Sequence, residues 1–133
     1  MAETDDFLSE ILPRLRAAEL ALHRGDAGPR CELWSRAEPV TLFGAEVTRS
    51  GRAEIESTFE WVASRFTECT SLEHEVIAAE ASGDLAYVSA IERISARANG
   101  VASTYALRAT TIFRREEGTW RAIHRHGDPY TGT

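Results

Sequence analysis

The sequence contains no lysine and no glutamine, and its only asparagine is Asn99, so all 15 basic residues are arginine. This bias indicates a GC-rich bacterial genome, because Ala, Arg and Gly have GC-rich codons whereas Lys and Asn do not. It points to a source and not to a function. It does exclude any mechanism that forms a Schiff base with a lysine of this chain.

Long apolar runs and clustered positive charge are also missing. No stretch approaches the roughly 18 apolar residues of a membrane span, and the acidic start of the chain, with Glu3, Asp5 and Asp6, does not resemble the basic start of a signal peptide. We therefore expect a cytoplasmic protein with no membrane partner. The net charge is -6 and Arg114-Arg115 is the only adjacent basic pair. This argues against a nucleic acid partner, because phosphate binding needs clustered cations.

Motifs for several common chemistries are absent as well. The two cysteines, Cys31 and Cys69, stand far apart without a CxxC or Cys/His spacing, which favours buried thiols over a disulfide or a zinc site. The sequence holds no glycine-rich phosphate loop, no serine nucleophile motif and no dinucleotide fingerprint. These absences argue against redox and phosphoryl-transfer chemistry, and we expect no cofactor.

What is present is typical of one globular domain. The 133 residues are 43% hydrophobic and 27% charged, which are ordinary values for a globular protein. A chain of this length can enclose one hydrophobic core but is too short for two. We therefore predict one domain over residues 1–133.

The first part of the chain predicts helices. Between residues 5 and 24 apolar side chains recur every three or four positions, as on one face of a helix. We expect Pro13 to interrupt this pattern and to begin a second helical segment at its first turn. A short helix is expected over residues 29–35. A further amphipathic helix is predicted after Ser50-Gly51 by Ile55, Phe59, Val62 and Phe66.

The second part predicts strands. Residues 40–44 form a β-rich run, onto which residues 46–49 are expected to pair back. From residue 71 onward the residue types predict four more strands over residues 72–81, 85–95, 101–115 and 119–126. Asn99-Gly100 is a strong two-residue hairpin signal. Together these patterns predict an α+β fold in which three N-terminal helices cover the concave face of a curved antiparallel sheet and leave a pocket.

Three segments, in this order, resemble the nuclear transport factor 2-like superfamily and in particular its SnoaL-like bacterial branch. They are Gly25-Asp26 after the first helix, residues 40–44 followed by Ser50-Gly51, and residues 107–120 running into the last strand. The resemblance covers nearly the whole chain. It implies a cone-shaped, cystatin-like α+β barrel with a deep pocket, usually in a homodimer, and we expect a homodimer formed through the sheet.

The same resemblance leaves the function open. Members of the superfamily include ketosteroid isomerases, polyketide cyclases, dehydratases, epoxide hydrolases and non-catalytic association domains, so the fold does not select an activity. We expect a protein that binds a small, largely apolar organic molecule. Cofactor-free isomerase, cyclase or dehydratase activity by acid–base catalysis is one interpretation, and a non-catalytic ligand-binding or association module is the other.

The last predicted strand ends in two imidazoles and a carboxylate, those of His124, His126 and Asp128. Side chains alternate along a strand, so the two histidines share a face and Arg125 lies on the other. Three interpretations stay open: acid–base catalysis, ligation of a divalent metal, or structural hydrogen bonding. Asp128 could orient a histidine, or it could begin a turn with Pro129.

A second candidate pair comes from the two strands before it. Glu92 shares a mostly apolar face with Val88 and Ile94, and Arg108 shares a face with Thr110. We predict that Glu92 and Arg108 meet across the hairpin as a partly buried ion pair, facing the two histidines in the pocket. That pair is either structural, or it leaves Arg108 to bind an anionic or carbonyl oxygen of a ligand.

Aromatic side chains complete the predicted site. Trp34 and Trp61 lie off the clearest helix faces, so we place them near the mouth of the pocket. The predicted catalytic residues are His124, His126, Asp128 and Glu92. The predicted ligand-binding residues are Arg108, Trp34, Trp61, Tyr87 and Thr110, and no residue is assigned to a metal.

Overall fold

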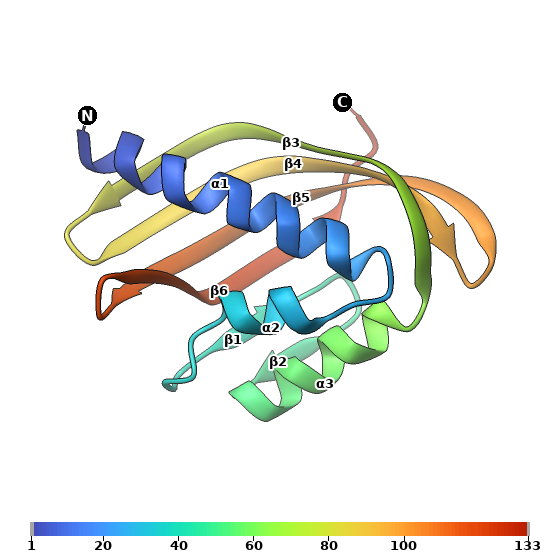
Figure 1. Cartoon of the computed structure of the whole chain (residues 1–133), viewed down its shortest axis with the longest axis horizontal. Coiled ribbons are helices and arrows are strands. Elements are labelled where there is room, and N and C mark those ends of the chain that lie inside the picture. Colours follow the sequence, from blue (N-terminus) through green and yellow to red (C-terminus); the bar gives the residue numbers. More distant parts are fainter. Residues whose placement is uncertain (1, 133) are drawn as a thin grey trace.

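The computed structural model describes residues 2–132 and packs three helices against a curved, six-stranded sheet (Figure 1). The helices are α1 (Ala2–Leu22), α2 (Gly28–Leu33) and α3 (Arg52–Ala63). The strands are β1 (Thr41–Phe43), β2 (Thr48–Ser50), β3 (Phe66–Ser82), β4 (Leu85–Ala98), β5 (Val101–Glu116) and β6 (Thr119–Pro129). The predicted α+β class is confirmed.

The strands follow the order β2-β1-β6-β5-β4-β3. Strands β3 to β6 form the predicted antiparallel meander, and β1 pairs with β2 in a short hairpin. The sheet is mixed and not wholly antiparallel, because β1 runs parallel to β6 and places Thr41 beside His124. The long strands curl around α1, which crosses the sheet, while α2 and α3 lie near β1 and β2 (Figure 1). We call the face toward the helices the inner face and the other the outer face.

Helix α1 is continuous, so the prediction that Pro13 separates two helices is wrong. Pro13 has no N–H, so one backbone carbonyl group of the preceding turn loses its hydrogen-bond donor. Because Pro13 lies on the exposed side of the helix, that carbonyl group can bind water instead. The buried side of α1 is unbroken on both sides of this position and includes Phe7, Ile11 and Leu15. Packing of this face against the sheet therefore outweighs the lost hydrogen bond.

The strands form where they were predicted but with shifted ends, and two of these shifts bring Phe66 and Asp128 into strands. Phe66 begins β3 and does not extend the apolar face of α3, which ends at Ala63. Strand β6 runs on to Pro129, so Asp128 lies within the strand and not in a turn. The hairpin at Asn99-Gly100 forms as predicted, with φ values of 52° and 79° at its two central residues. These positive angles belong to the turn type that matches the twist of a hairpin.

The main core lies between the sheet and the helices. The ring of Phe7 packs edge-on against Phe113 and Trp120, at centroid distances of 5.4 and 5.0 Å. Trp34 packs in the same way on Phe59 at 5.5 Å and is only 2% exposed. Trp34 is therefore a core residue, and its predicted position at the mouth of the pocket is wrong.

Both cysteines are free thiols, as expected. Cys69 is buried and Cys31 is partly buried. Across the described residues, none of the helices is both long enough and apolar enough to cross a membrane.

Candidate functional site

A cavity of about 170 Å³ lies inside the cone, between the inner face of the sheet and the helices. Its apolar wall comes mainly from helices, from β1 and from β5, and includes Leu22, Leu42, Phe59, Val62 and Leu107. Its polar groups come from all three helices, from the residue after α1 and from two strands, and they include Glu19, His23, Arg30, Thr58, Tyr105 and Arg125. An apolar chamber with a few converging polar groups is typical of a small-molecule site.

Arg125 forms a two-point ion pair with Glu92 on the inner face. Its Nη1 and Nη2 donate to the Glu92 carboxylate oxygens at 2.8 and 2.7 Å, and the side chains are only 7% and 4% exposed. Burial alone would raise the pKa of Glu92, but the charge and hydrogen bonds of Arg125 hold that pKa well below its usual range. Both groups are therefore charged at neutral pH.

His74 faces the same carboxylate from the neighbouring strand β3. Its Nε2 lies 3.5 Å from Glu92 Oε2, a distance typical of an ion pair but without the alignment of a hydrogen bond. Within residues 2–132 this buried nitrogen has no hydrogen-bond partner. The imidazole therefore lies beside the buried ion pair without adding a hydrogen bond to it.

A second buried ion pair joins the first two helices. Arg30 of α2 donates to Glu19 of α1, and their side chains are 9% and 4% exposed. The guanidinium group also lies 4.7 Å from the centroid of the Phe59 ring. Burial lowers the pKa of Arg30 while Glu19 opposes that shift. The two ion pairs leave the interior of the cone neutral overall but strongly polar.

His23 and Tyr105 form a hydrogen-bonded pair at the cavity wall. His23 Nδ1 lies 2.7 Å from the backbone carbonyl oxygen of Glu19, which can only accept a hydrogen bond. Nδ1 therefore carries a proton, and in the neutral ring Nε2 must accept the hydroxyl proton of Tyr105. Burial lowers the pKa of His23, even though the Glu19 carboxylate lies 4.0 Å from Nδ1. Burial raises the pKa of Tyr105, so the phenol keeps its proton.

Glu92 is on the inner face as predicted, but the predicted partner is wrong. In the observed register Glu92 lies opposite Leu107 and Arg108 lies opposite Ile91. Residues directly opposite one another in a sheet share a face, so Arg108 and Glu92 point to opposite sides. Arg125 takes the position that the prediction gave to Arg108.

The two histidines of the last strand lie on the outer face, outside the cone. His124 pairs with Ile112 and His126 with Thr110, while Asp128 lies opposite Arg108. The predicted placement of His124, His126, Asp128, Arg108 and Thr110 in the pocket is therefore wrong. Their predicted role in catalysis or ligand binding stays a prediction.

The outer-face residues form a shallow hollow of about 550 Å³ that is open to solvent. His124 Nδ1 lies 2.7 Å from the hydroxyl oxygen of Thr41, and the ring of Phe43 packs edge-on against both histidines. Arg108 Nε lies 3.4 Å from Asp128 Oδ1 in a largely exposed ion pair. Burial and the neighbouring His126 lower the pKa of His124.

The remaining predicted residues lie outside the interior cavity. Tyr87 is on the outer face, with 37% of its surface exposed. Trp61 is 54% exposed and borders an open groove beside α3. In the part of the chain that the structure describes, no three His, Cys, Asp or Glu side chains are grouped so that they could hold a metal ion.

The sequence contained a signal for the interior site that the prediction did not use. Glu19 lies in the apolar stripe of α1 beside Leu15, Ala18 and Leu22, and His23 follows it by four residues, directly after the end of the helix. Polar residues at positions i and i+4 that continue a buried apolar stripe point to a polar interior, because they cannot be buried without partners. Tyr105 and Arg30 had no comparable signal.

Comparisons with known proteins identify the architecture. A family model of the SnoaL-like domain matches residues 15–129. A search of curated protein sequences found no match. Among solved structures, a Streptomyces avermitilis protein provisionally described as a dehydratase of the nuclear transport factor 2-like family is 21% identical. It superimposes with a TM-score of 0.76 over 96% of this chain and 99% of its own.

Two other solved structures show the range of proteins with this fold. One is a Xanthomonas campestris protein provisionally described as a calcium/calmodulin-dependent protein kinase II association domain. It is 18% identical with a TM-score of 0.70, over 93% of this chain and 88% of its own. The other is a Novosphingobium aromaticivorans protein with a cystatin-like fold, 21% identical with a TM-score of 0.69, over 94% of this chain and 82% of its own. Likeness at this level shows the fold alone.

Proposed function

The chain belongs to the SnoaL-like domain family of the nuclear transport factor 2-like superfamily, as its sequence predicted, and from this premise we propose that it binds a small, largely apolar organic molecule inside the cone and transfers a proton on it. The observation that carries the proposal is the bond between His23 and Tyr105 at the cavity wall. This pair takes the role that the sequence had assigned to His124 and His126.

The size and lining of the cavity limit the ligand. A volume of about 170 Å³ is close to the roughly 150 Å³ of a cavity that accepts benzene. The part of the ligand that enters the cone is therefore about the size of one six-membered ring. Its body contacts Leu42, Phe59 and Leu107, and a carbonyl or hydroxyl oxygen on it would lie near the polar groups.

The hydrogen-bond directions support a proton relay. Tyr105 donates its hydroxyl proton to His23 Nε2, so its oxygen is left as an acceptor for a proton of the ligand. If the ligand proton moves to this oxygen while the phenol proton moves to Nε2, the result is an imidazolium ion beside the carboxylate of Glu19. The charged Arg125, which also lines the cavity, would stabilise the enolate oxygen formed on the ligand.

This step is common to the reactions of the predicted enzyme class. Removal of a proton beside a carbonyl group gives an enolate. Return of the proton at another carbon is an isomerisation, loss of a neighbouring hydroxide is a dehydration, and attack on a second carbonyl is a cyclisation. The proposal therefore covers only the proton transfer. Which bonds change after it depends on the groups that the ligand carries.

The test uses cyclohexanone, a ketone of the size of the cavity. In D₂O the protein should exchange the protons beside the carbonyl group faster than buffer does, as measured by ¹H NMR. Tyr105→Phe should remove most of this acceleration, because the phenylalanine ring keeps the shape of the wall but neither accepts nor donates a proton. Equal acceleration by Tyr105→Phe and the unmodified protein would contradict the relay.

A non-catalytic module is the second candidate, favoured by one feature of the outer face. Apolar side chains are exposed there, among them Ile77, Leu85 and Tyr87, on the same face as the ion pair of Arg108 and Asp128. We propose that a second copy of the chain covers this face in a homodimer. A two-fold axis would bring the Arg108 of each copy near the Asp128 of the other, so the surface can be self-complementary.

A further inference from the structure

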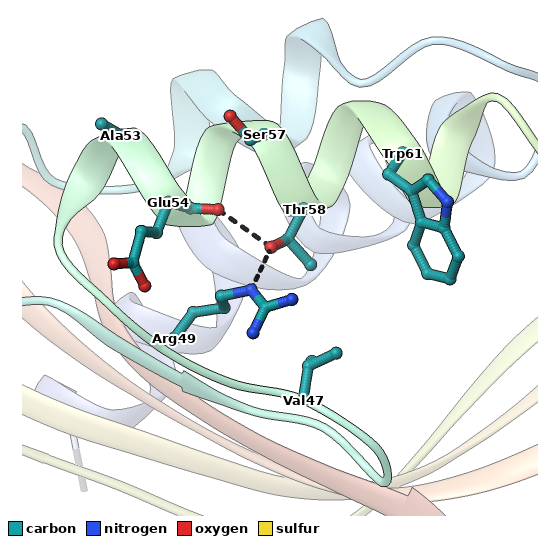
Figure 2. Close-up of a pocket in the computed structure, with 7 residues that line it drawn as sticks. All are labelled: Val47, Arg49, Ala53, Glu54, Ser57, Thr58 and Trp61. Carbon is teal, nitrogen blue, oxygen red and sulfur yellow. Dashed lines mark hydrogen bonds between the residues drawn. The ribbon is translucent and has the colours of Figure 1, made fainter.

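The groove beside α3 that Trp61 borders lies directly beside the interior cavity, between β2 and α3 (Figure 2). It has a volume of about 520 Å³ and is open to solvent. Val47 and Thr58 line both this groove and the interior cavity, so these two side chains form the boundary between them. In Figure 2, Val47 and Arg49 rise from the hairpin toward α3, and Thr58 and Trp61 point down from the helix.

Trp61 supplies an aromatic surface to the groove. The indole is 54% exposed, although α3 buries Ile55 and Phe59 on its other side. The Arg65 guanidinium lies 4.8 Å from the indole centroid and packs against the ring. An exposed indole beside a groove is suited to stack on a flat, apolar group.

Arg49 supplies a positive charge that is held in place. Its Nε donates to Thr58 Oγ1 at 3.0 Å, and Thr58 in turn donates to the backbone carbonyl oxygen of Glu54 at 2.9 Å. A further bond at 3.2 Å joins Nη1 to the carbonyl oxygen of Thr48. Among residues 2–132 no carboxylate forms an ion pair with Arg49.

The one carboxylate that lines the groove is directed elsewhere. Glu54 accepts a hydrogen bond from the backbone N–H of Ser50 at 3.4 Å, and its carboxylate points away from Trp61 (Figure 2). Arg49 is therefore a cation without a carboxylate partner in a protein whose net charge is -6. Such a group favours an anionic ligand.

The size of the interior cavity makes the groove relevant to the ligand. The cavity holds only a ring-sized group, whereas the groove has about three times its volume. A longer ligand whose head occupies the cone would pass Val47 and Thr58 and continue into the groove. There it would meet an aromatic surface and a cation.

We propose, resting on the function proposed above, that the ligand is a two-part aromatic acid. Its ring-sized head enters the cone, its second ring stacks on Trp61, and a carboxylate on that ring pairs with Arg49. The groove thus selects the ligand by its tail, whereas the cone acts on its head.

The test compares three phenols by isothermal titration calorimetry. They are phenol, 4-phenethylphenol, and 4-phenethylphenol with a para carboxylate on its second ring. The carboxylated probe should bind about 10-fold or more tightly than phenol, given the usual strength of ring stacking and of a charged hydrogen bond. Trp61→Ala should remove the gain of both two-ring probes, and Arg49→Gln only the part that the carboxylate adds. Neither change should alter the binding of phenol.

Arg36→Gln is the matched control, since it removes an exposed arginine that does not line the groove. The inference is overturned if phenol binds but the two-ring probes bind no more tightly, or if their gain survives in both groove variants. It is also overturned if Trp61→Ala dissociates a dimer, because the groove would then be an interface between copies. Failure of phenol itself to bind would contradict the proposed function together with the inference.

Discussion

Glu92 and Arg125 form a two-point ion pair that spans the inner face of the sheet over the intervening strand β5. Their strands, β4 and β6, are not neighbours and share no backbone hydrogen bonds. The ion pair therefore links two strands that the backbone hydrogen bonds of the sheet do not link directly. Because both charges are almost completely removed from water, the pair is sensitive to the loss of either partner.

Glu92→Leu should lower the free energy of unfolding by about 3–5 kcal/mol, because it leaves the buried charge of Arg125 without a partner. Urea unfolding measures this loss. The double variant Glu92→Leu/Arg125→Met should recover most of it, since neither charge is then buried. The exposed ion pair of Arg36 and Glu32 is the control, and Arg36→Met should have a much smaller effect. An equally large loss in the double variant would show that packing matters more than charge.

The same pair predicts a dependence of stability on acid. Arg125 holds the pKa of Glu92 well below its ordinary value of 4.5 in the folded state, although burial acts in the opposite direction. Below about pH 4.5 the unfolded chain therefore binds a proton that the folded chain does not, and stability falls as the pH decreases. Unfolding free energies between neutral pH and about pH 3 should show a shallower decrease in Glu92→Leu/Arg125→Met. Identical slopes would contradict this assignment.

The sequence predicted the order of the elements and the presence of a charged pair inside the cone, but not which residues form it. Alternation along β6 correctly separated Arg125 from His124 and His126. It did not say which of these faces the helices. That choice follows from the pairing register, in which Glu92 meets Leu107 and not Arg108, and a shift of one residue reverses every side chain.

The interior site depends on contacts that are far apart in the sequence. His23 and Tyr105 are brought together by the packing of α1 on the sheet, over a separation of 82 residues. No local pattern encodes such a contact. Trp34 shows the same limit, since it lies off the clear helix stripes and yet is buried against Phe59. Composition, periodicity and turn signals therefore define the cone, and only its tertiary packing defines the chemistry inside.

His23 should contribute a second pH dependence, nearer neutrality. Burial lowers its pKa from 6.5 in the folded protein, so below about pH 6.5 the unfolded chain binds a proton more readily. The free energy of unfolding should therefore fall as the pH drops through this region. His23→Gln should remove this component, because the amide oxygen can still accept from Tyr105 but does not titrate. Urea unfolding at pH values on both sides of 6.5 would detect the difference.

The two candidate locations for catalysis can be separated by a pair of histidine variants. His23→Gln should abolish accelerated proton exchange of cyclohexanone, because the relay loses its base. His126→Ala should leave the rate unchanged, since His126 lies on the outer face, away from the cavity. Circular dichroism would establish that both variants are folded. Loss of exchange in His126→Ala alone would place the reaction on the outer face, where the sequence analysis had its catalytic residues.

The proposed homodimer makes a prediction about the exposed apolar side chains. Leu85 lies on the outer face and is 54% exposed. In a dimer formed through this face, Leu85→Glu would bury one carboxylate from each copy, either near the two-fold axis or beside apolar groups of the partner. The cost of burying unpaired charges should shift the protein to monomer, as measured by light scattering after size-exclusion chromatography. Val101 is the control, because it is 67% exposed beside the Asn99-Gly100 turn, at the far end of the hairpin. Val101→Glu should therefore leave the molecular mass unchanged. A monomer before any substitution, or a dimer that survives Leu85→Glu, would contradict association through this face.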